Sequence, residues 1–390
     1  MPTPLALTGD ALEIADVVSV ARAGRPVRLA AQAVRRMRAA RAVVERHLSD
    51  GRAHYGINTG FGSLAKKRIA PGDLETLQRN LVRSHSAGAG EPLPRDVTRA
   101  MMLCLAASLC RGHSGVRPEL VELLVGMLNN GVTPVVPSIG SVGASGDLAP
   151  LAAVALAMIG EGACEVGGGG MSSSRALRGG RLRPVTLKAK EGLALINGTH
   201  LMCGWGSLLI EDADVLYTSA VVALAMSIDA CRASHGFLDP RLYDVRGSID
   251  GAVAAAVSAL LHGSTIRTSH LEHDTRVQDP YSLRAAPTVL AAVRRSLDNA
   301  GAAVGGELGG VTDNPLVFAR GGAGAGGIVS GANFHGMPLA IPLDCLAIAV
   351  FHIAGISERR SYLMTGAFEP ESRLSPFLTP RPGLSSGLMI

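Results

Sequence analysis

Long stretches rich in alanine and leucine constrain the fold of this chain more than any other feature. They cover residues 200–235, 249–262, 285–304 and 338–365, and residues 96–130 have the same helical character. Aromatic residues make up only 3% of the 390 residues, so the interior must be built from Ala, Val, Leu, Ile and Met. These side chains let helices approach one another closely. We therefore expect a mainly α fold dominated by a bundle of long helices.

Composition and charge narrow the class of protein. With 47% hydrophobic and 18% charged residues, the chain can bury a large core. The net charge is +5, and the Lys and Arg residues are scattered along the sequence rather than gathered into a block, so we expect no nucleic-acid partner. The six cysteines form no CxxC pair and lie mostly in apolar stretches, which favours a reducing compartment.

The sequence also bears on location. The N-terminus lacks the basic segment that is typical of a signal peptide. The apolar runs 218–228 and 345–357 are too short, or too closely flanked by charge, for the roughly 20 residues of a membrane span. We therefore predict a cytoplasmic protein without a membrane partner.

Two glycine-rich segments, 167–180 and 320–327, are of low complexity and are predicted to extend from the surface. The second contains GAGAGG at 322–327, which matches GxGxxG, but no strand pattern precedes it and no helix pattern follows. A dinucleotide site is therefore not expected there. His270 and His273 share one face of a possible helix, yet no third ligand of suitable spacing lies nearby, so a polar surface pair is favoured over a zinc site.

The segment GSVGASGDLAP, residues 140–150, joins small and pliable residues directly to an apolar helical run. If the chain folds back tightly, the amide nitrogen of Gly146 can attack the carbonyl carbon of Ala144. Loss of water from this adduct and from Ser145 leaves a five-membered ring with an exocyclic methylene, an electrophile of a kind that enzymes normally obtain from a cofactor. Asp147 is placed to assist as acid or base, and the following helix N-terminus would stabilise negative charge on the ring.

Further motifs follow one another along nearly the whole chain: YGINTGFG (55–62), NLVRSHSAGAGEPL (80–93), GSVGASGDLAPLA (140–152), KEGLALINGT (190–199), VQDPYSLR (277–284), TDNPLVF (312–318), NFHG (333–336) and ISERR (356–360). In this set and order, the sequence resembles the histidine and aromatic amino acid ammonia-lyases. Their 4-methylidene-imidazol-5-one (MIO) group forms from an Ala-Ser-Gly triplet. The resemblance implies an MIO made from Ala144, Ser145 and Gly146 and supported by Asp147, with no metal and no soluble cofactor.

The resemblance implies catalytic and binding roles for matching residues. Tyr55 would be the base that removes a proton from the substrate's β-carbon, which a phenol does when nearby charges or dipoles favour its phenolate. Arg284 would hold the α-carboxylate through its planar guanidinium. Asn197 would hydrogen-bond the ring or the substrate carboxylate. Tyr281 would join the catalytic residues, and Gln278 and Phe334 would line the same cavity, although a purely structural role remains the alternative for these three.

Substrate choice depends on a smaller set of residues. Ser84 and His85 look like the pair found in the histidine-specific enzymes, and His85 can donate to or accept from an imidazole. Met389 matches a pocket-lining methionine of the same enzymes. The resemblance thus implies elimination of ammonia from L-histidine to trans-urocanate, although His200 stands where these enzymes usually have Gln. The alternatives are a phenylalanine or tyrosine ammonia-lyase or aminomutase, and an inactive truncated helical scaffold.

The resemblance also implies the organisation of the chain. We expect an N-terminal, loop-rich, MIO-bearing domain at 1–200 and a central helical bundle at 201–390, of the ammonia-lyase and fumarase-like type. Family chains continue past this point, so the bundle is expected to be incomplete at its C-terminal end, with the start of a helix that ends in Leu388, Met389 and Ile390. Similar enzymes are homotetramers in which three subunits build each active site, so a homotetramer is expected.

Overall fold

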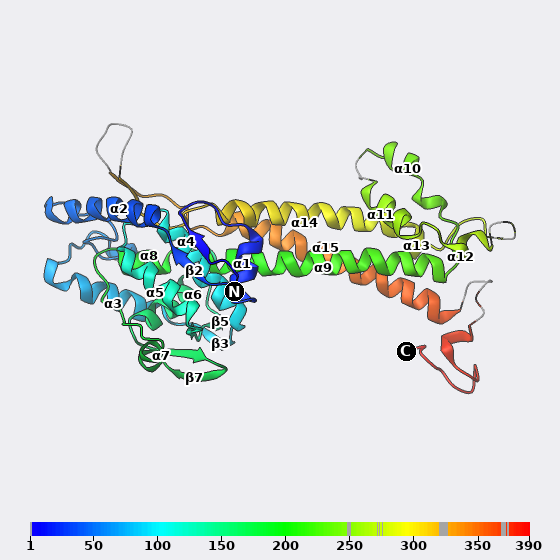
Figure 1. Ribbon diagram of the computed structural model, residues 1–390, viewed down its shortest axis with the longest axis horizontal. Helices are drawn as coiled ribbons and strands as arrows, with labels where there is room; N and C mark the ends of the chain where they lie inside the picture. Colours follow the sequence, from blue (N-terminus) through cyan, green and yellow to red (C-terminus); the bar gives the residue numbers. More distant parts are fainter. Residues whose placement is uncertain are drawn as a thin grey trace. The chain divides into compact units, whose positions relative to one another are not determined.

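The computed structural model describes residues 2–247, 251–270, 272, 274, 276–319, 327–367, 372 and 374–390. The chain forms two compact units (Figure 1). Unit 1 comprises Met1–Glu211 and Gly301–Ile341, and unit 2 comprises Asp212–Ala300 and Pro342–Ile390. Three long helices contribute residues to both units: α9 (His200–Ala230), α14 (Ala286–Leu308) and α15 (Met337–Gly366). The mainly α fold expected from the sequence is confirmed.

Unit 1 is built around α4 (Arg95–Cys110), whose residues 97–110 are all buried. This helix packs against α1 (Ile14–Ala21) and α5 (Pro118–Asn129). The remaining helices of the unit are α2 (Ala31–Ser49), α3 (Leu74–His85), α6 (Leu148–Met158), α7 (Ser173–Gly179) and α8 (Glu191–Ile196), with 3-10 turns η1 (Gly62–Leu64) and η2 (Pro71–Asp73). Helices α3, α6 and α8 pack against one another. This trio carries the loops that contain most of the predicted site residues of unit 1.

Short strands join these helices. Strands β1 (Leu5–Leu7) and β2 (Val27–Leu29) pair in parallel, and β3 (Ala89–Pro92) pairs antiparallel with β5 (Pro137–Ile139). The order β4 (Thr133–Pro134), β6 (Ala163–Val166), β7 (Gly169–Ser172) makes an antiparallel sheet, and β8 (Leu316–Phe318) pairs antiparallel with β9 (Gly327–Val329). The β3–β5 pair brings the segment after α3 next to the start of residues 140–150.

Residues 167–180 lie mostly at the surface, as expected, but their structure is regular. Strands β6 and β7 form a hairpin, and α7 follows directly. Gly167 and Gly168 connect the strands with φ of +59° and +83°, which is the backbone conformation that a tight two-residue hairpin turn requires. The glycines that suggested low complexity are therefore turn residues of a regular hairpin.

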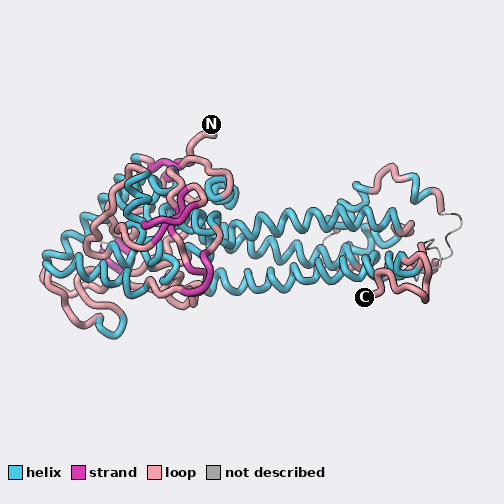
Figure 2. Tube along the Cα trace, turned by 90° about the horizontal axis from the view of Figure 1, so that it is seen from below, coloured by secondary structure: helices cyan, strands magenta, loops and turns pink. Residues whose placement is uncertain are grey.

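Unit 2 is helical. Besides its parts of α9, α14 and α15, it contains α10 (Pro240–Asp244), α11 (Ala252–Leu260), α12 (Thr265–Thr268) and α13 (Tyr281–Arg284), with 3-10 turns η3 (Gly236–Leu238) and η4 (Pro376–Leu378). Its three long helical segments run alongside one another (Figure 2). Arg294 of α14 contacts α9 twice, through an ion pair of 2.5 Å with Asp214 and by stacking over the Tyr217 ring.

Two expectations for the C-terminal half are corrected. Residues 379–390 form turns and bends instead of beginning a helix, because Pro380, Pro382 and two glycines interrupt the segment. The apolar run 345–357, judged too short for a membrane span, belongs to a 30-residue helix. Among the described residues, α15 is the one helix long and apolar enough to cross a membrane, by length and composition alone.

Candidate active site

Residues 143–147 make a tight turn between β5 and α6. The Gly146 N–H donates to the carbonyl oxygen of Gly143 at 3.3 Å, and the φ of Gly146 is +76°. A Cβ on Gly146 would lie 2.4 Å from the carbonyl oxygen of Gly198. Glycine is therefore required here twice, by the left-handed backbone and by the close approach of a second chain segment. This folded-back turn is what cyclisation of Ala144, Ser145 and Gly146 needs.

Two other segments hold this turn in place. The Asn197 side-chain amide donates to the carbonyl oxygen of Ser145 at 3.1 Å, and the Asp147 N–H donates to the carbonyl oxygen of Gly198 at 2.8 Å. The Gly336 N–H donates to the carbonyl oxygen of Gly143, also at 2.8 Å. Asn197 thus touches the predicted MIO peptide itself. Phe334 belongs to the 333–336 segment that contacts the turn through Gly336, and its side chain is half-buried.

Asp147 is fully buried directly behind the turn. Its carboxylate accepts hydrogen bonds from the Ser141 hydroxyl at 2.7 Å and from the backbone N–H groups of Leu201 and Met202 at 2.8 and 3.0 Å. The last two donors are in the first turn of α9, where the helix dipole favours an anion. Burial nevertheless outweighs these bonds and raises the pKa of Asp147 to about 6. A carboxyl with this pKa can both give and take a proton near neutral pH.

Tyr55 lies half-buried on the loop that follows α2. Its neighbour Gly56 has a φ of +71°, and a Cβ there would lie 2.5 Å from a methyl group of Leu193 in α8. Asn58 clamps the loop, because its side chain accepts from the His54 N–H at 2.7 Å and donates to the Arg52 carbonyl at 2.8 Å. The Tyr55 loop therefore packs on α8, the helix whose C-cap is Asn197.

Ser84 and His85 lie at the C-terminal end of α3. The His85 Nδ1 is 2.9 Å from the carbonyl oxygen of Leu81, so it carries the hydrogen and leaves Nε2 as an acceptor. The Ser84 hydroxyl donates to the same carbonyl at 2.9 Å. A Cβ on Gly140 would lie 3.3 Å from the Cα of Gly88, so the segment after His85 runs beside the MIO peptide.

The other predicted site residues lie in unit 2. Gln278 and Tyr281 are exposed, and the Arg284 guanidinium stacks over the Tyr281 ring at 5.1 Å. The Nε of Arg284 is buried and has no hydrogen-bond partner in the part of the chain that the structure describes. Met389 is half-exposed in the final turns. His273 and most of GAGAGG lie outside the described residues.

Two buried groups of unit 1 have surroundings that the sequence did not predict. His200 is buried with both ring nitrogens unpaired among the described residues, and burial lowers its pKa to about 4. It lines a cavity of about 10 Å³, room for a single water, together with Thr199, Thr312 and Glu307. Lys190 forms a buried ion pair with Asp313 at 2.6 Å. Lys190 lies in the motif KEGLALINGT and Asp313 in the motif TDNPLVF. No local pattern in either motif indicated that the two charges pair.

Comparisons with known proteins identify similar chains and folds. Residues 12–390 match the family model described as aromatic amino acid lyase. The chain is 46% identical to the histidine ammonia-lyase of Anaeromyxobacter sp. (strain K), covering 99% of this chain and 77% of that protein. It is similar to the crystal structure of histidine ammonia-lyase from Trypanosoma cruzi, with a TM-score of 0.87, 39% identity and coverage of 99% and 72%. It is also similar to tyrosine aminomutase from Streptomyces globisporus, with a TM-score of 0.89, 33% identity and coverage of 99% and 76%.

Proposed function

Because the chain belongs to the aromatic amino acid lyase family, we propose that it removes ammonia from L-histidine and releases trans-urocanate. The chain is thus a carbon–nitrogen lyase. The observation that carries the choice of histidine is the 46% identity to a histidine ammonia-lyase over 99% of this chain. The tyrosine aminomutase has an equally similar fold but a lower identity of 33%, so the fold alone does not choose the substrate.

The proposal includes an MIO formed from Ala144, Ser145 and Gly146. Its support is the tight turn, the double requirement for glycine at Gly146 and the buried Asp147 carboxyl with its pKa of about 6. When formed, this group supplies an electron-poor carbon that helps an amino acid lose a poor leaving group. The Asn197 amide would hold the peptide through the carbonyl of Ser145.

The chain's own side chains would bind and deprotonate the substrate. Tyr55 takes the β-proton, and its loop is held at a defined place by Asn58 and by packing on α8. Arg284 binds the α-carboxylate, and its buried Nε has a hydrogen to offer. The His85 Nε2 accepts the N–H of the substrate imidazole, since its Nδ1 already donates to Leu81. By the resemblance, Gln278, Tyr281, Phe334, Ser84 and Met389 would contact the substrate, with Tyr281 beside the reacting atoms.

We further propose a cytoplasmic homotetramer. Only 17% of the most apolar 18-residue stretch of α15 is buried in the single chain. Ile348 and Phe351 of this helix are 65% and 70% exposed, and Met226 of α9 is 69% exposed. Large exposed apolar side chains gathered on long helices indicate a surface that another protein surface or lipid covers. Copies of the same chain, packed helix against helix, would cover it without a membrane.

One experiment tests the reaction and separates the alternatives. The purified protein is incubated with L-histidine, L-phenylalanine and L-tyrosine, and the absorbance of urocanate, cinnamate and coumarate is followed. We expect urocanate alone. Cinnamate or coumarate would give the phenylalanine or tyrosine alternative, and a β-amino acid product would indicate an aminomutase. If no product forms and the intact mass shows no loss of water, the result would support the alternative of an inactive helical scaffold.

A further inference from the structure

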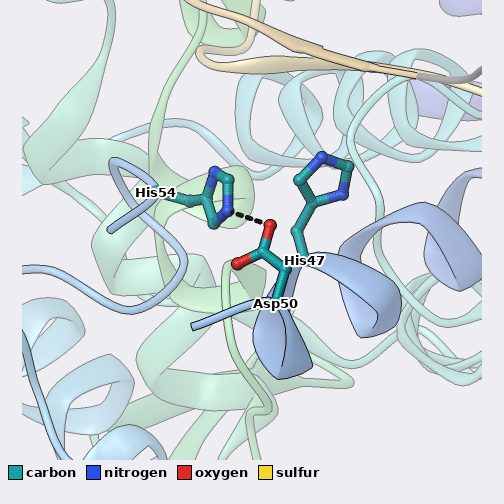
Figure 3. Close-up of side chains that lie close together, drawn as sticks. All are labelled: His47, Asp50 and His54. Carbon is teal, nitrogen blue, oxygen red and sulfur yellow. Dashed lines mark hydrogen bonds and ion pairs between the residues drawn. The ribbon is translucent and has the colours of Figure 1, made fainter. Parts of the chain in front are cut away.

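Three side chains around the C-terminal end of α2 bring potential metal ligands together: His47, Asp50 and His54 (Figure 3). One nitrogen or carboxylate oxygen of each residue lies within 4.8 Å of those of the other two. The His54 Nε2 is 2.8 Å from an oxygen of Asp50, and the two imidazole rings meet edge to face with centroids 4.7 Å apart. The histidines are half-buried and Asp50 is exposed. None of the three has a part in the reaction proposed above.

Local structure builds this cluster. His47 lies in the last turn of α2, and Asp50 follows three residues later as the C-cap, so both face the same side of the helix. Asp50 also accepts a hydrogen bond from the Arg52 N–H at 2.8 Å, which turns the chain back toward the helix. The Asn58 clamp then holds His54 over the helix end. These contacts hold the three side chains close together, and an ion would take the place of the hydrogen between the His54 Nε2 and Asp50.

The hydrogen bonding of His47 is that of a metal ligand. Its Nδ1 lies 2.9 Å from the carbonyl oxygen of Val43. A carbonyl only accepts, so Nδ1 carries the hydrogen and the lone pair is on Nε2. Metal-binding histidines usually donate their other N–H to a carbonyl or carboxylate in this way, which fixes the tautomer and the orientation of the ring.

The charges of the surroundings also favour a cation. The carboxylate of Asp50 supplies a negative charge beside the two imidazoles. The C-terminal end of α2 adds the negative pole of the helix dipole. Two imidazoles and one carboxylate are a donor set that suits Zn²⁺ and similar divalent transition metals, with a fourth position left for water.

We propose that His47, Asp50 and His54 form a binding site for one divalent transition-metal ion of the Zn²⁺ type. Tyr55 directly follows His54, so the ion ties residues 52–60 to the end of α2. It does so without entering the elimination reaction. Binding therefore slows the opening of this loop, and the proposal stands independently of the substrate that the enzyme uses.

The test is a Co²⁺ titration of the metal-free full chain, because tetrahedral Co²⁺ absorbs visible light and Zn²⁺ displaces it. We expect one Co²⁺ per chain. His47→Gln and Asp50→Asn should each weaken Co²⁺ binding at least about tenfold. His262→Gln, which removes an exposed histidine elsewhere, is the matched control and should bind as the wild type does. Melting of each variant without metal verifies that it is folded.

A second measurement reads the loop directly. Hydrogen exchange of residues 52–60 should slow when Zn²⁺ is added to the wild type and should not respond in His47→Gln. Wild type that binds no Co²⁺ would overturn the proposal, as would equal affinity in wild type and His47→Gln. A thiolate charge-transfer band would also overturn it, by assigning the ion to a cysteine. Histidine turnover plays no part in these readouts, so the failure of either proposal is distinguishable from that of the other.

Discussion

The carboxylate of Asp147 accepts a hydrogen bond from the backbone N–H of Leu201 at 2.8 Å, although 54 residues separate them in the chain. This bond joins the start of α6 to the start of α9, immediately behind the predicted MIO peptide. The carboxylate is fully buried, and its pKa of about 6 is well above the ordinary 3.8. The charge of this buried carboxyl therefore affects the stability of the fold.

Asp147→Asn should remove a pH dependence of stability. The folded-state pKa is raised, so between about pH 4 and pH 6 the native chain holds a proton that the unfolded chain has lost. Wild-type stability therefore falls as the pH rises through this window, by on the order of 3 kcal/mol from this group. An Asn keeps the shape and can accept from Leu201 and Met202 while donating to Ser141. Urea unfolding at several pH values measures the difference, and parallel curves for the two proteins would contradict it.

Ser145→Ala should abolish both ring formation and turnover while the protein stays folded. The serine hydroxyl is lost as water during cyclisation, and a methyl in its place at a turn costs little packing. Intact mass should show wild type two waters lighter than its sequence and the variant unmodified. Ser219→Ala is the matched control, since it removes a serine hydroxyl that bonds the Val215 carbonyl on an exposed face of α9, away from the triplet. A collapsed Ser145→Ala protein would speak against this expectation.

Gly146→Ala should also prevent the ring, by blocking the turn. Its Cβ would lie 2.4 Å from the Gly198 carbonyl oxygen, at a φ of +76°. We expect a loss of stability on the order of 1–3 kcal/mol from backbone strain, and no loss of water by mass spectrometry. Gly170→Ala, at a hairpin position with open space around it, should change neither. A ring that forms normally in Gly146→Ala would refute the requirement for glycine.

Tyr55→Phe should keep the ring and lose turnover. Removing a general base typically costs roughly 10²–10⁴-fold in rate. The ring would form within the 143–147 turn, and Tyr55 makes no hydrogen bond to that turn among the residues that the structure describes. The mass of the variant should therefore still be two waters below that of its sequence. Tyr243→Phe, which loses only a bond to the Phe237 carbonyl, is the control and should retain activity. A fully active Tyr55→Phe would remove Tyr55 from the role of base.

Lys190→Met should destabilise the fold more than a surface charge change does. Lys190 and Asp313 are both buried, and removal of one partner leaves an uncompensated buried charge, at a cost of roughly 3–5 kcal/mol. Lys188 is two positions before Lys190, and its ion pair with Glu75 is half-exposed. Lys188→Met removes this pair and should change the unfolding free energy little. Chemical denaturation measures both variants. Equal effects would show that the buried pair is not a stabilising contact.

Much of the candidate site could be read from motifs. The triplet Ala144-Ser145-Gly146 carries its chemistry in adjacent residues, and the MIO family is recognised by the order of motifs along the chain. The pairing of Lys190 with Asp313 could not be read, because it joins residues 123 positions apart. The cluster of His47, Asp50 and His54 could not be predicted from the sequence for a different reason. Its spacing crosses from a helix into a loop, where helical periodicity no longer tells which side chains meet.

The sequence by itself determined the mainly helical fold, the long helices and the cyclisable peptide, because periodicity and small residues act over a few positions. Only the tertiary structure decided that the Gly198 carbonyl lies against Gly146 and that Asp147 is buried against the first turn of α9. It also decided that residues 163–172 form a hairpin. Contacts between distant segments depend on how whole elements pack, and each buried polar group finds its partner, or fails to, only once that packing is complete.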